Sequence, residues 1–430
     1  MDAPISVDKL RFLLFRFKEK LWVRPLTLCI LSICAVFFAK LADLSFLAQH
    51  LPSVEQGSVD SLLSIMASSM LVIATFSAGT MVNAYASASQ SSTPRSLSLI
   101  ISDDVSQNAL STFVGAFIYS VVALTVSENH FFSEAGIFVL FVMTGIVFGV
   151  VIITFVRWVD SVARLGRVGS TILKVEAATK RAIEHRIDTP YLGGVGSHMI
   201  KEQGAYPIFT DKVGYIQLVD MSLLQNWAKR NNAFVNVVKL PGQFVTPNEP
   251  IAFVSKDVGN DVERLLCTFK IHEARSFEAD PRFGFIVMAE IASKALSTSI
   301  NDPGTAIAVI TSFTRLLRQW EKREETRVAN DKSGVAKPKY DCVSVPALDT
   351  ESMYDDAFTS VMRDGAAVLE VNIKLLKSLA ILHNTDNETQ QQITHKFAQK
   401  VFTRANASLK FDDDKTRIKD LYEALFEQPK

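Results

Sequence analysis

The chain has 430 residues, 48% of them hydrophobic, and its 45 basic and 45 acidic side chains give a formal net charge of +0. This balance gives no support to nucleic-acid binding, which depends on clustered positive charge. The four cysteines form no CxxC pair, so we expect neither a disulfide framework nor a metal site, and no motif indicates a cofactor.

Hydrophobic residues are unevenly distributed along the chain. Long apolar runs occupy positions 1–160, and the remainder has the composition of a soluble protein. This division predicts an α-helical membrane domain followed by a cytoplasmic α+β domain. Residues 1–24 are basic with interleaved Leu and Phe, which is typical of an amphipathic segment on the inner membrane surface.

Four membrane spans are expected, at 25–47, 59–85, 110–126 and 135–156, within a transmembrane domain of residues 25–157. Each is an apolar run near the length of roughly 20 residues that a bilayer requires. The loops 48–58 and 127–134 contain no Lys or Arg, whereas the opposite ends of the spans are basic. The positive-inside rule therefore places both termini in the cytoplasm, with Trp158 in the aromatic belt of the inner interface.

The second span carries small and hydroxylated side chains on one side, at about 100° per residue. This face either packs against a neighbouring helix or lines a water-filled path. Asn83 is the hardest of these residues to place against lipid, because an unpartnered amide there is costly. The pore-lining candidates are Ser61, Ser64, Ser68, Thr75, Gly79, Asn83 and, at the cytoplasmic mouth, Arg95.

The soluble part begins with an expected connecting helix over 158–187, whose basic character also suits contact with anionic lipid. Residues 188–257 alternate in the period of short strands and predict a small β-rich module. Its stretch from Pro241 to Ile251 resembles the β-sandwich of lipoyl and biotinyl modules. No lysine lies at a hairpin tip there, so that resemblance implies no attached cofactor.

Residues 258–430 predict a helical domain, interrupted by a charged loop at 321–340 and by a short strand at 341–346. Asp280–Pro281 and Asp302–Pro303 each have the composition of a helix start, with an Asp N-cap and Pro in the first turn. Two carboxylates brought together could instead perform acid–base chemistry or hold a metal. The residues to which these alternatives, helix capping or chemistry, apply are Glu278, Asp280, Arg282, Asn301, Asp302 and Thr305.

Two segments of this domain resemble a bacterial family of predicted membrane proteins of unknown function. They are Arg275-Ser-Phe-Glu-Ala-Asp-Pro-Arg-Phe-Gly284 and Ala295-Leu-Ser-Thr-Ser-Ile-Asn-Asp-Pro-Gly-Thr-Ala306. The chain departs from the family pattern at Ala279, where Gln is usual, and at Thr298, where Pro is usual. The resemblance implies a four-span architecture in a bacterial inner membrane, and it implies no reaction.

Two classes of function are consistent with these patterns. The first is an oligomeric channel or transport protein, with the second span lining the path and the cytoplasmic domain assembling or gating it. The second is a membrane-anchored sensor or scaffold whose cytoplasmic domain binds a ligand or partner. The chain carries no HExxH, GxSxG or kinase signature, which disfavours an enzyme. The expected partners are the lipid bilayer and further copies of the chain.

Overall fold

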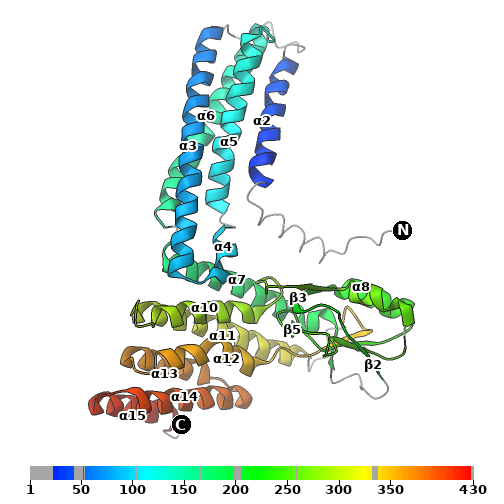
Figure 1. The fold of residues 1–430 in the computed structure, drawn as a ribbon, viewed down its shortest axis with the longest axis vertical. Helices are drawn as coiled ribbons and strands as arrows, with labels where there is room; N and C mark the ends of the chain where they lie inside the picture. Colours follow the sequence, from blue (N-terminus) through cyan, green and yellow to red (C-terminus); the bar gives the residue numbers. More distant parts are fainter. Residues whose placement is uncertain are drawn as a thin grey trace. The chain divides into compact units, whose positions relative to one another are not determined.

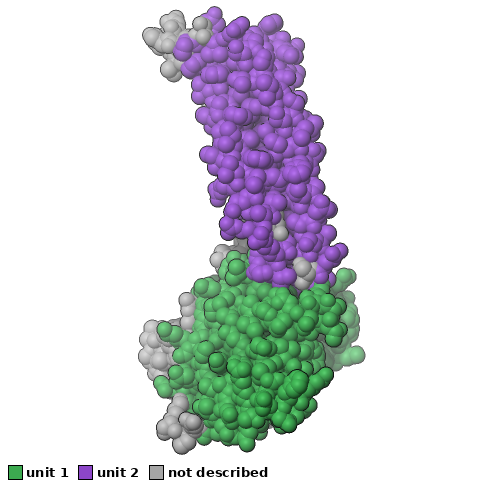
Figure 2. Space-filling view, turned by 90° about the vertical axis from the view of Figure 1, so that its left-hand side faces the viewer, with its two compact units in different colours: residues 1–11, 172–430 green, residues 12–171 purple. Residues whose placement is uncertain are grey.

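A computed structural model describes residues 23–42, 52, 54–101, 104–164, 166–197, 205–257, 259–331 and 338–427. The predicted amphipathic segment at 1–24 lies almost wholly outside these residues, as do residues 332–337 of the charged loop predicted at 321–340. The first part of that predicted loop, 321–331, is instead helical and forms the end of α11 (Pro303–Asp331). The chain divides into two compact units, residues 12–171 and a second unit that contains residues 172–430 (Figure 2).

The first unit is a bundle of long helices (Figure 1). It contains α2 (Val23–Ala42), α3 (Gln56–Ser91), α5 (Asp104–Glu128) and α6 (Glu134–Val162), with the short η2 (Pro94–Ser96) and α4 (Leu97–Ile101) between α3 and α5. Among the described residues, three segments are long and apolar enough to cross a membrane: Gln56–Gln90, Val105–Glu128 and Glu134–Val162. The apolar part of α2 is shorter, Val23–Phe37, so the span expected at 25–47 remains a prediction.

Helix α5 is the centre of this bundle and contacts α2, α3 and α6. One series of its buried positions alternates in steps of three and four residues, and all members of that series except Phe113 are small. Such spacing brings helices together as in a left-handed coiled coil, and small side chains let the backbones approach closely. At Gly115, an added Cβ would lie 3.3 Å from Leu28 Cβ of α2. The buried series is Ser106, Ala109, Phe113, Ala116, Ser120, Ala123 and Ser127.

The second unit contains a stack of helices and two small sheets (Figure 1). The helices are α7 (Val168–Asp188), α8 (Met221–Arg230), α9 (Val262–Leu266), α10 (Pro281–Ala295), α11 (Pro303–Asp331), α12 (Thr350–Asp364), α13 (Leu369–His383), α14 (Glu388–Ser408) and α15 (Asp412–Phe426). Buried aromatic rings join α10, α11, α12 and α14: Phe285 contacts Phe313, Phe313 contacts Phe358, and Phe397 contacts Tyr354 and Phe358.

The strands form a five-stranded sheet in the order β1-β8-β4-β6-β2 and a three-stranded sheet in the order β5-β3-β7. Their bounds are β1 (Val195–Gly196), β2 (Tyr206–Ile208), β3 (Gly214–Val219), β4 (Val235–Val237), β5 (Phe244–Val245), β6 (Ala252–Val254), β7 (Phe269–His272) and β8 (Val343–Val345). The predicted strand at 341–346 is β8, which pairs in parallel with both β1 and β4. Because β7 and β8 come from beyond residue 257, the sheets are not made by residues 188–257 alone, and the lipoyl-type likeness stays a prediction.

The connecting helix differs from the predicted 158–187. Helix α6 continues to Val162, and α7 begins only at Val168. Gly166 between them has a φ of 78°, a left-handed conformation that glycine adopts at little cost and that ends a helix. The chain therefore leaves the bundle through a turn.

Candidate functional site

The polar side of α3 faces away from its own bundle. All six α3 candidates, from Ser61 to Asn83, have exposed side chains in this unit. Leu63, Met70 and Met81 lie on the other side and are buried. A Cβ added at Gly79 would meet no atom within 4 Å. The candidate stripe thus lies on the exposed side of α3.

Three hydroxyl groups of this stripe, those of Ser61, Ser68 and Thr75, have hydrogen-bond partners within α3. Ser61 Oγ donates to the Gly57 carbonyl at 2.8 Å, and Thr75 Oγ1 donates to the Leu71 carbonyl at 3.0 Å. A hydroxyl bonded to the preceding turn loses little when it faces lipid. The Ser61, Ser68 and Thr75 hydroxyls therefore do not require water as a partner. Asn83 makes no hydrogen bond with any residue that the structure describes.

The depth of Asn83 follows from the contact between α3 and α6. The ring centroids of Phe76 and Trp158 are 6.2 Å apart, and Arg157 is the first charged residue after the apolar run of α6. Asn83 lies seven residues beyond Phe76, or about 10 Å farther along the helix axis. Asn83 therefore lies past the level at which the apolar run of α6 ends, where an amide can reach water.

Trp158 does not have the exposed position that an aromatic belt predicts. It is 2% exposed and its ring contacts Phe76, Phe113 and Phe155 inside the bundle. The ring of Trp158 is instead packed among α3, α5 and α6. Arg95, in η2, is exposed, and its backbone N–H donates to Thr93 Oγ1 at 3.3 Å.

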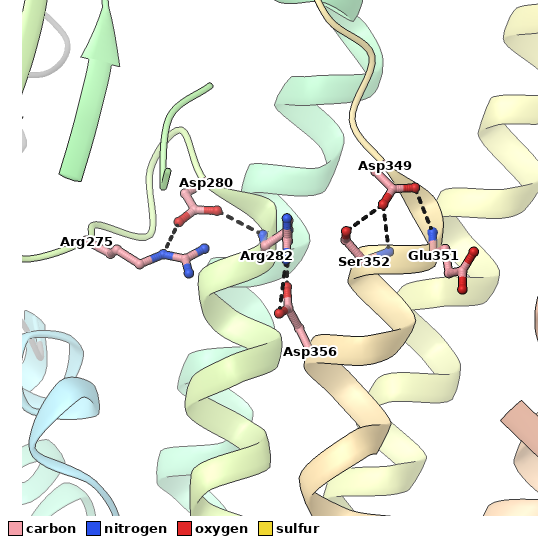
Figure 3. A network of polar contacts seen from close by, with 7 residues as sticks. All are labelled: Arg275, Asp280, Arg282, Asp349, Glu351, Ser352 and Asp356. Carbon is pink, nitrogen blue, oxygen red and sulfur yellow. Dashed lines mark hydrogen bonds and ion pairs between the residues drawn. The ribbon is translucent and has the colours of Figure 1, made fainter. Parts of the chain in front are cut away.

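The Asp280 carboxylate begins α10 and joins a buried network of charges (Figure 3). Its Oδ1 accepts the backbone N–H of Arg282 at 3.1 Å, as an N-cap does. Its Oδ2 accepts Nε of Arg275 at 2.7 Å. The guanidinium of Arg275 also lies 5.4 Å from the ring centroid of Phe283, which packs against Phe277. Contacts among residues of the segment 275–284 itself thus stabilise the start of α10.

Two further arginines surround this carboxylate. Arg282 forms a bidentate pair with Asp356 of α12, at 2.6 and 3.1 Å. Burial opposes the charge of Arg282. The hydrogen bonds to Asp356 and the negative charges of Asp356, Asp280 and Asp349 outweigh burial and raise the pKa of Arg282. Arg186 of α7 is 4% exposed. Burial lowers the pKa of Arg186 to about 10, although the negative charge of Asp280 acts in the opposite direction. It donates to the Ala279 carbonyl at 3.3 Å.

Two glycines allow other elements to reach this network. At Gly242, where φ is 90°, an added Cβ would lie 2.1 Å from Asp280 Oδ2. The Pro241–Gly242 turn of the β module therefore rests directly on the carboxylate. At Gly284, an added Cβ would lie 1.6 Å from Thr179 Oγ1, so α10 and α7 cross at this point. Together these contacts join α7, the β module, α10 and α12.

Asp302 also caps a helix, but at an exposed position. Its carboxylate accepts the backbone N–H and the hydroxyl of Thr305 at 3.0 and 2.6 Å. These bonds, that of the hydroxyl first, lower the pKa of Asp302. Asn301 before it has a φ of 50°, a left-handed conformation that asparagine tolerates better than most residues.

The structure does not bring the two aspartates together. Asp280 precedes the 15 residues of α10 and Asp302 follows them, a separation of about 22 Å along the helix. Glu278 is half-buried beside Asp280. No group of three or more His, Cys, Asp or Glu side chains with metal-binding geometry occurs among the described residues. Asp280 and Asp302 each accept a backbone N–H in the first turn of the helix that follows, as the predicted caps do, and the structure keeps these two carboxylates apart.

The sequence interpretation missed Arg186 and Asp356. Arg186 continues the buried face of α7 that contains Ile172, Val175, Thr179 and Ile183, so its spacing would have placed it inward. Asp356 lies 74 residues from its partner Arg282, and no local pattern indicates such a pair.

Comparison with known proteins adds a family to this geometry. The family described as "Predicted membrane protein (DUF2254)" matches residues 18–381. The chain belongs to this family. Uncharacterised proteins of Mycobacterium tuberculosis (strains CDC 1551 and H37Rv) and of Mycobacterium bovis are 31% identical to it over 113 residues, which is 25% of this chain and 22% of each relative. The match thus spans about a fifth of those relatives, and no solved structure matches the chain.

The DUF2254 match includes the helical bundle and both aspartate caps but ends before α14 and α15. Helix α14 is nevertheless integral to the second unit of this DUF2254 protein. Gln390 of α14 donates to buried Glu321 of α11, and donates at 2.5 Å to the hydroxyl of Tyr354 of α12. Tyr354 also donates to Glu321.

Proposed function

We propose that this DUF2254 protein forms an oligomer in the bacterial inner membrane, in which the exposed faces of α3 from several copies surround a path for ions or small solutes. The observation that carries the proposal is the outward orientation of the α3 stripe. Because Leu63 and Met70 occupy the bundle side of α3, the hydroxylated side is left for lipid, a second copy or water, and in this proposal it faces water. Helices α5 and α6 offer no comparable exposed stripe.

The charge at the end of the path favours anions. Arg95 follows α3 directly and is exposed, and a ring of such side chains would attract anions at the cytoplasmic mouth. The six positions on α3 include no carboxylate. Both termini lie in the cytoplasm in this proposal.

The cytoplasmic unit would assemble or gate the path through α7. Glu176 of α7 accepts two hydrogen bonds from Arg315, at 2.7 and 2.6 Å, and one from Ser312 at 2.7 Å, both on α11. With Arg186 beside Asp280 at the other end of α7, this helix is fixed to the helical stack at two points. A displacement of α7 would therefore carry α10 and α11 with it.

Cysteine substitution tests the path. In reconstituted liposomes, Ser68→Cys and Thr75→Cys should react with a charged thiol reagent and change the conductance. The matched controls are Leu63→Cys, which is buried, and Ile153→Cys, which is exposed on α6 and faces lipid. Protection of Ser68→Cys and Thr75→Cys to the same degree as Ile153→Cys would show that α3 faces lipid, and it would refute the path.

One observation favours the alternative, a membrane-anchored scaffold. The α3 hydroxyls bond their own helix, so they need no water-filled path. The oligomeric state in detergent separates the two functions. A monomer with no conductance would support the scaffold alternative, in which the cytoplasmic unit binds a ligand or partner.

A further inference from the structure

Three exposed arginines lie at the end of α6 and in the turn that follows it: Arg157, Arg164 and Arg167. Arg157 and Arg167 form no ion pair with any residue in the described part of the chain. Arg164 pairs with Asp160 at 3.0 Å, but both side chains remain about two-thirds exposed, at 70% and 67%. An ion pair this exposed contributes little, because water competes for both partners.

An apolar surface precedes these arginines on the same side of the helix. Ile153, one turn before Arg157, is 62% exposed, and Val156, the residue directly before Arg157, is 64% exposed. At about 100° per residue, Ile153, Arg157 and Arg164 fall on one side. The exposed face of α6 therefore changes from hydrocarbon-like to charged after Val156, with Arg157 and, just beyond the helix, Arg164 as its basic residues.

We infer that this end of α6 binds the headgroup of an anionic phospholipid. The acyl chains lie along Ile153 and Val156, and the phosphate is held by Arg157 and Arg164. A guanidinium offers two parallel N–H donors that match the oxygens of a phosphate. Arg157 and Arg164 are seven residues apart, about 10 Å along the axis, and long side chains can bend toward a shared level.

The thickness of a bilayer agrees with this placement. Beyond the hydrocarbon core, each leaflet adds roughly 5–8 Å of polar headgroup. With Ile153 and Val156 in the core, Arg157 enters the headgroup layer; Arg164, about 10 Å farther, starts just beyond this layer, and its long side chain bends back toward it. Asp160, between them, competes with the lipid phosphate for Arg164.

The opposite end of α6 provides an internal contrast. Glu134 begins the helix, Glu128 ends α5, and both are exposed. Anionic headgroups would be repelled there, so the attraction is confined to one end of the bundle. The inference depends on charge at the end of α6 and is independent of any path along α3.

The test uses the full chain purified in a neutral detergent. Phosphatidylglycerol and phosphatidylcholine are added in separate titrations. The melting temperature of the protein is measured in each, and native mass spectrometry measures how much of each lipid the protein retains. The variants are Arg157→Gln, the double variant Arg157→Gln with Arg164→Gln, and Asp160→Asn. Arg264→Gln is the control, because Arg264 is 79% exposed on α9 of the other unit.

Phosphatidylglycerol should stabilise the protein and be retained, and phosphatidylcholine should do neither to the same extent. Arg157→Gln should weaken retention about fivefold, the equivalent of the about 1 kcal/mol that a basic residue contributes at an anionic surface. The double variant should weaken it further, Asp160→Asn should strengthen it, and Arg264→Gln should leave it unchanged.

Three outcomes would overturn the inference. One is equal retention of the two lipids by the unsubstituted chain. Another is unchanged retention in the arginine variants. The third is an equal stabilisation by soluble glycerol phosphate, which would identify a site for free phosphate in place of a lipid headgroup.

Discussion

Replacing Asp280 and Asp302 in parallel should separate a buried charge network from an ordinary helix cap. Asp280→Ala removes an N-cap, which costs about 1 kcal/mol. It also leaves the guanidiniums of Arg275 and Arg186 buried without their carboxylate. Breaking a buried ion pair on one side costs about 3–5 kcal/mol. The total of about 4–6 kcal/mol is comparable with the stability of a whole domain, about 5–15 kcal/mol.

The conservative substitutions sharpen this comparison. Asp280→Asn keeps a capping oxygen but removes the charge, so it should still lose about 3–5 kcal/mol. Asp302→Asn should be nearly neutral, because asparagine caps as well as aspartate, and Asp302→Ala should cost about 1 kcal/mol. Exposure of the two carboxylates explains the contrast, since Asp280 is buried and Asp302 is not.

The assay is thermal or urea unfolding of the full chain in detergent, followed by circular dichroism. If Asp280→Asn were as mild as Asp302→Asn, the network around Asp280 would not contribute as described. If both Asp302 variants folded normally yet abolished a conductance shown by the unsubstituted chain, capping would be an insufficient account of Asp302.

Two further predictions concern topology and pH. A cysteine at Asn129 should label from outside intact cells, and one at Ser299 only after permeabilisation; the reverse pattern would contradict the positive-inside assignment. Burial opposes the charge of Glu176, but hydrogen bonds from Arg315 and Ser312 outweigh it and lower its pKa. A lowered carboxylate pKa stabilises the fold above the unfolded value, about 4.3, and this stability is lost as the pH falls through the folded pKa. Melting curves of the unsubstituted chain and Glu176→Gln should therefore converge below about pH 4, and a constant difference down to pH 2 would contradict the pairing.

Local patterns in the sequence determine much of this structure. The apolar runs locate α3, α5 and α6, and Asp–Pro pairs locate the starts of α10 and α11, because caps depend on only a few neighbouring residues. The depth of Asn83 could not be predicted in this way. It depends on the register between α3 and α6, which the Phe76–Trp158 contact sets. The pairing of Arg282 with Asp356 depends in the same way on the packing of α10 against α12.

The hydroxyls of α3 show a different limit. Their spacing correctly places them on one side of the helix, and that side is exposed in the bundle. Spacing does not reveal that each hydroxyl can bond to the preceding turn of its own helix. For this reason, a polar stripe in the sequence is weaker evidence for a water-filled path than the pattern alone indicates.

The position of β8 has a consequence for the order in which this protein is made. β8 lies between β1 and β4, and it is encoded about 100 residues after β4. At about 5–20 residues per second, the ribosome needs several seconds to supply it. During that interval β1 lacks a partner and β4 has one open edge, and such edges invite pairing with other chains. Truncation before residue 343 should therefore yield a chain that inserts its spans but aggregates through its unfinished sheet.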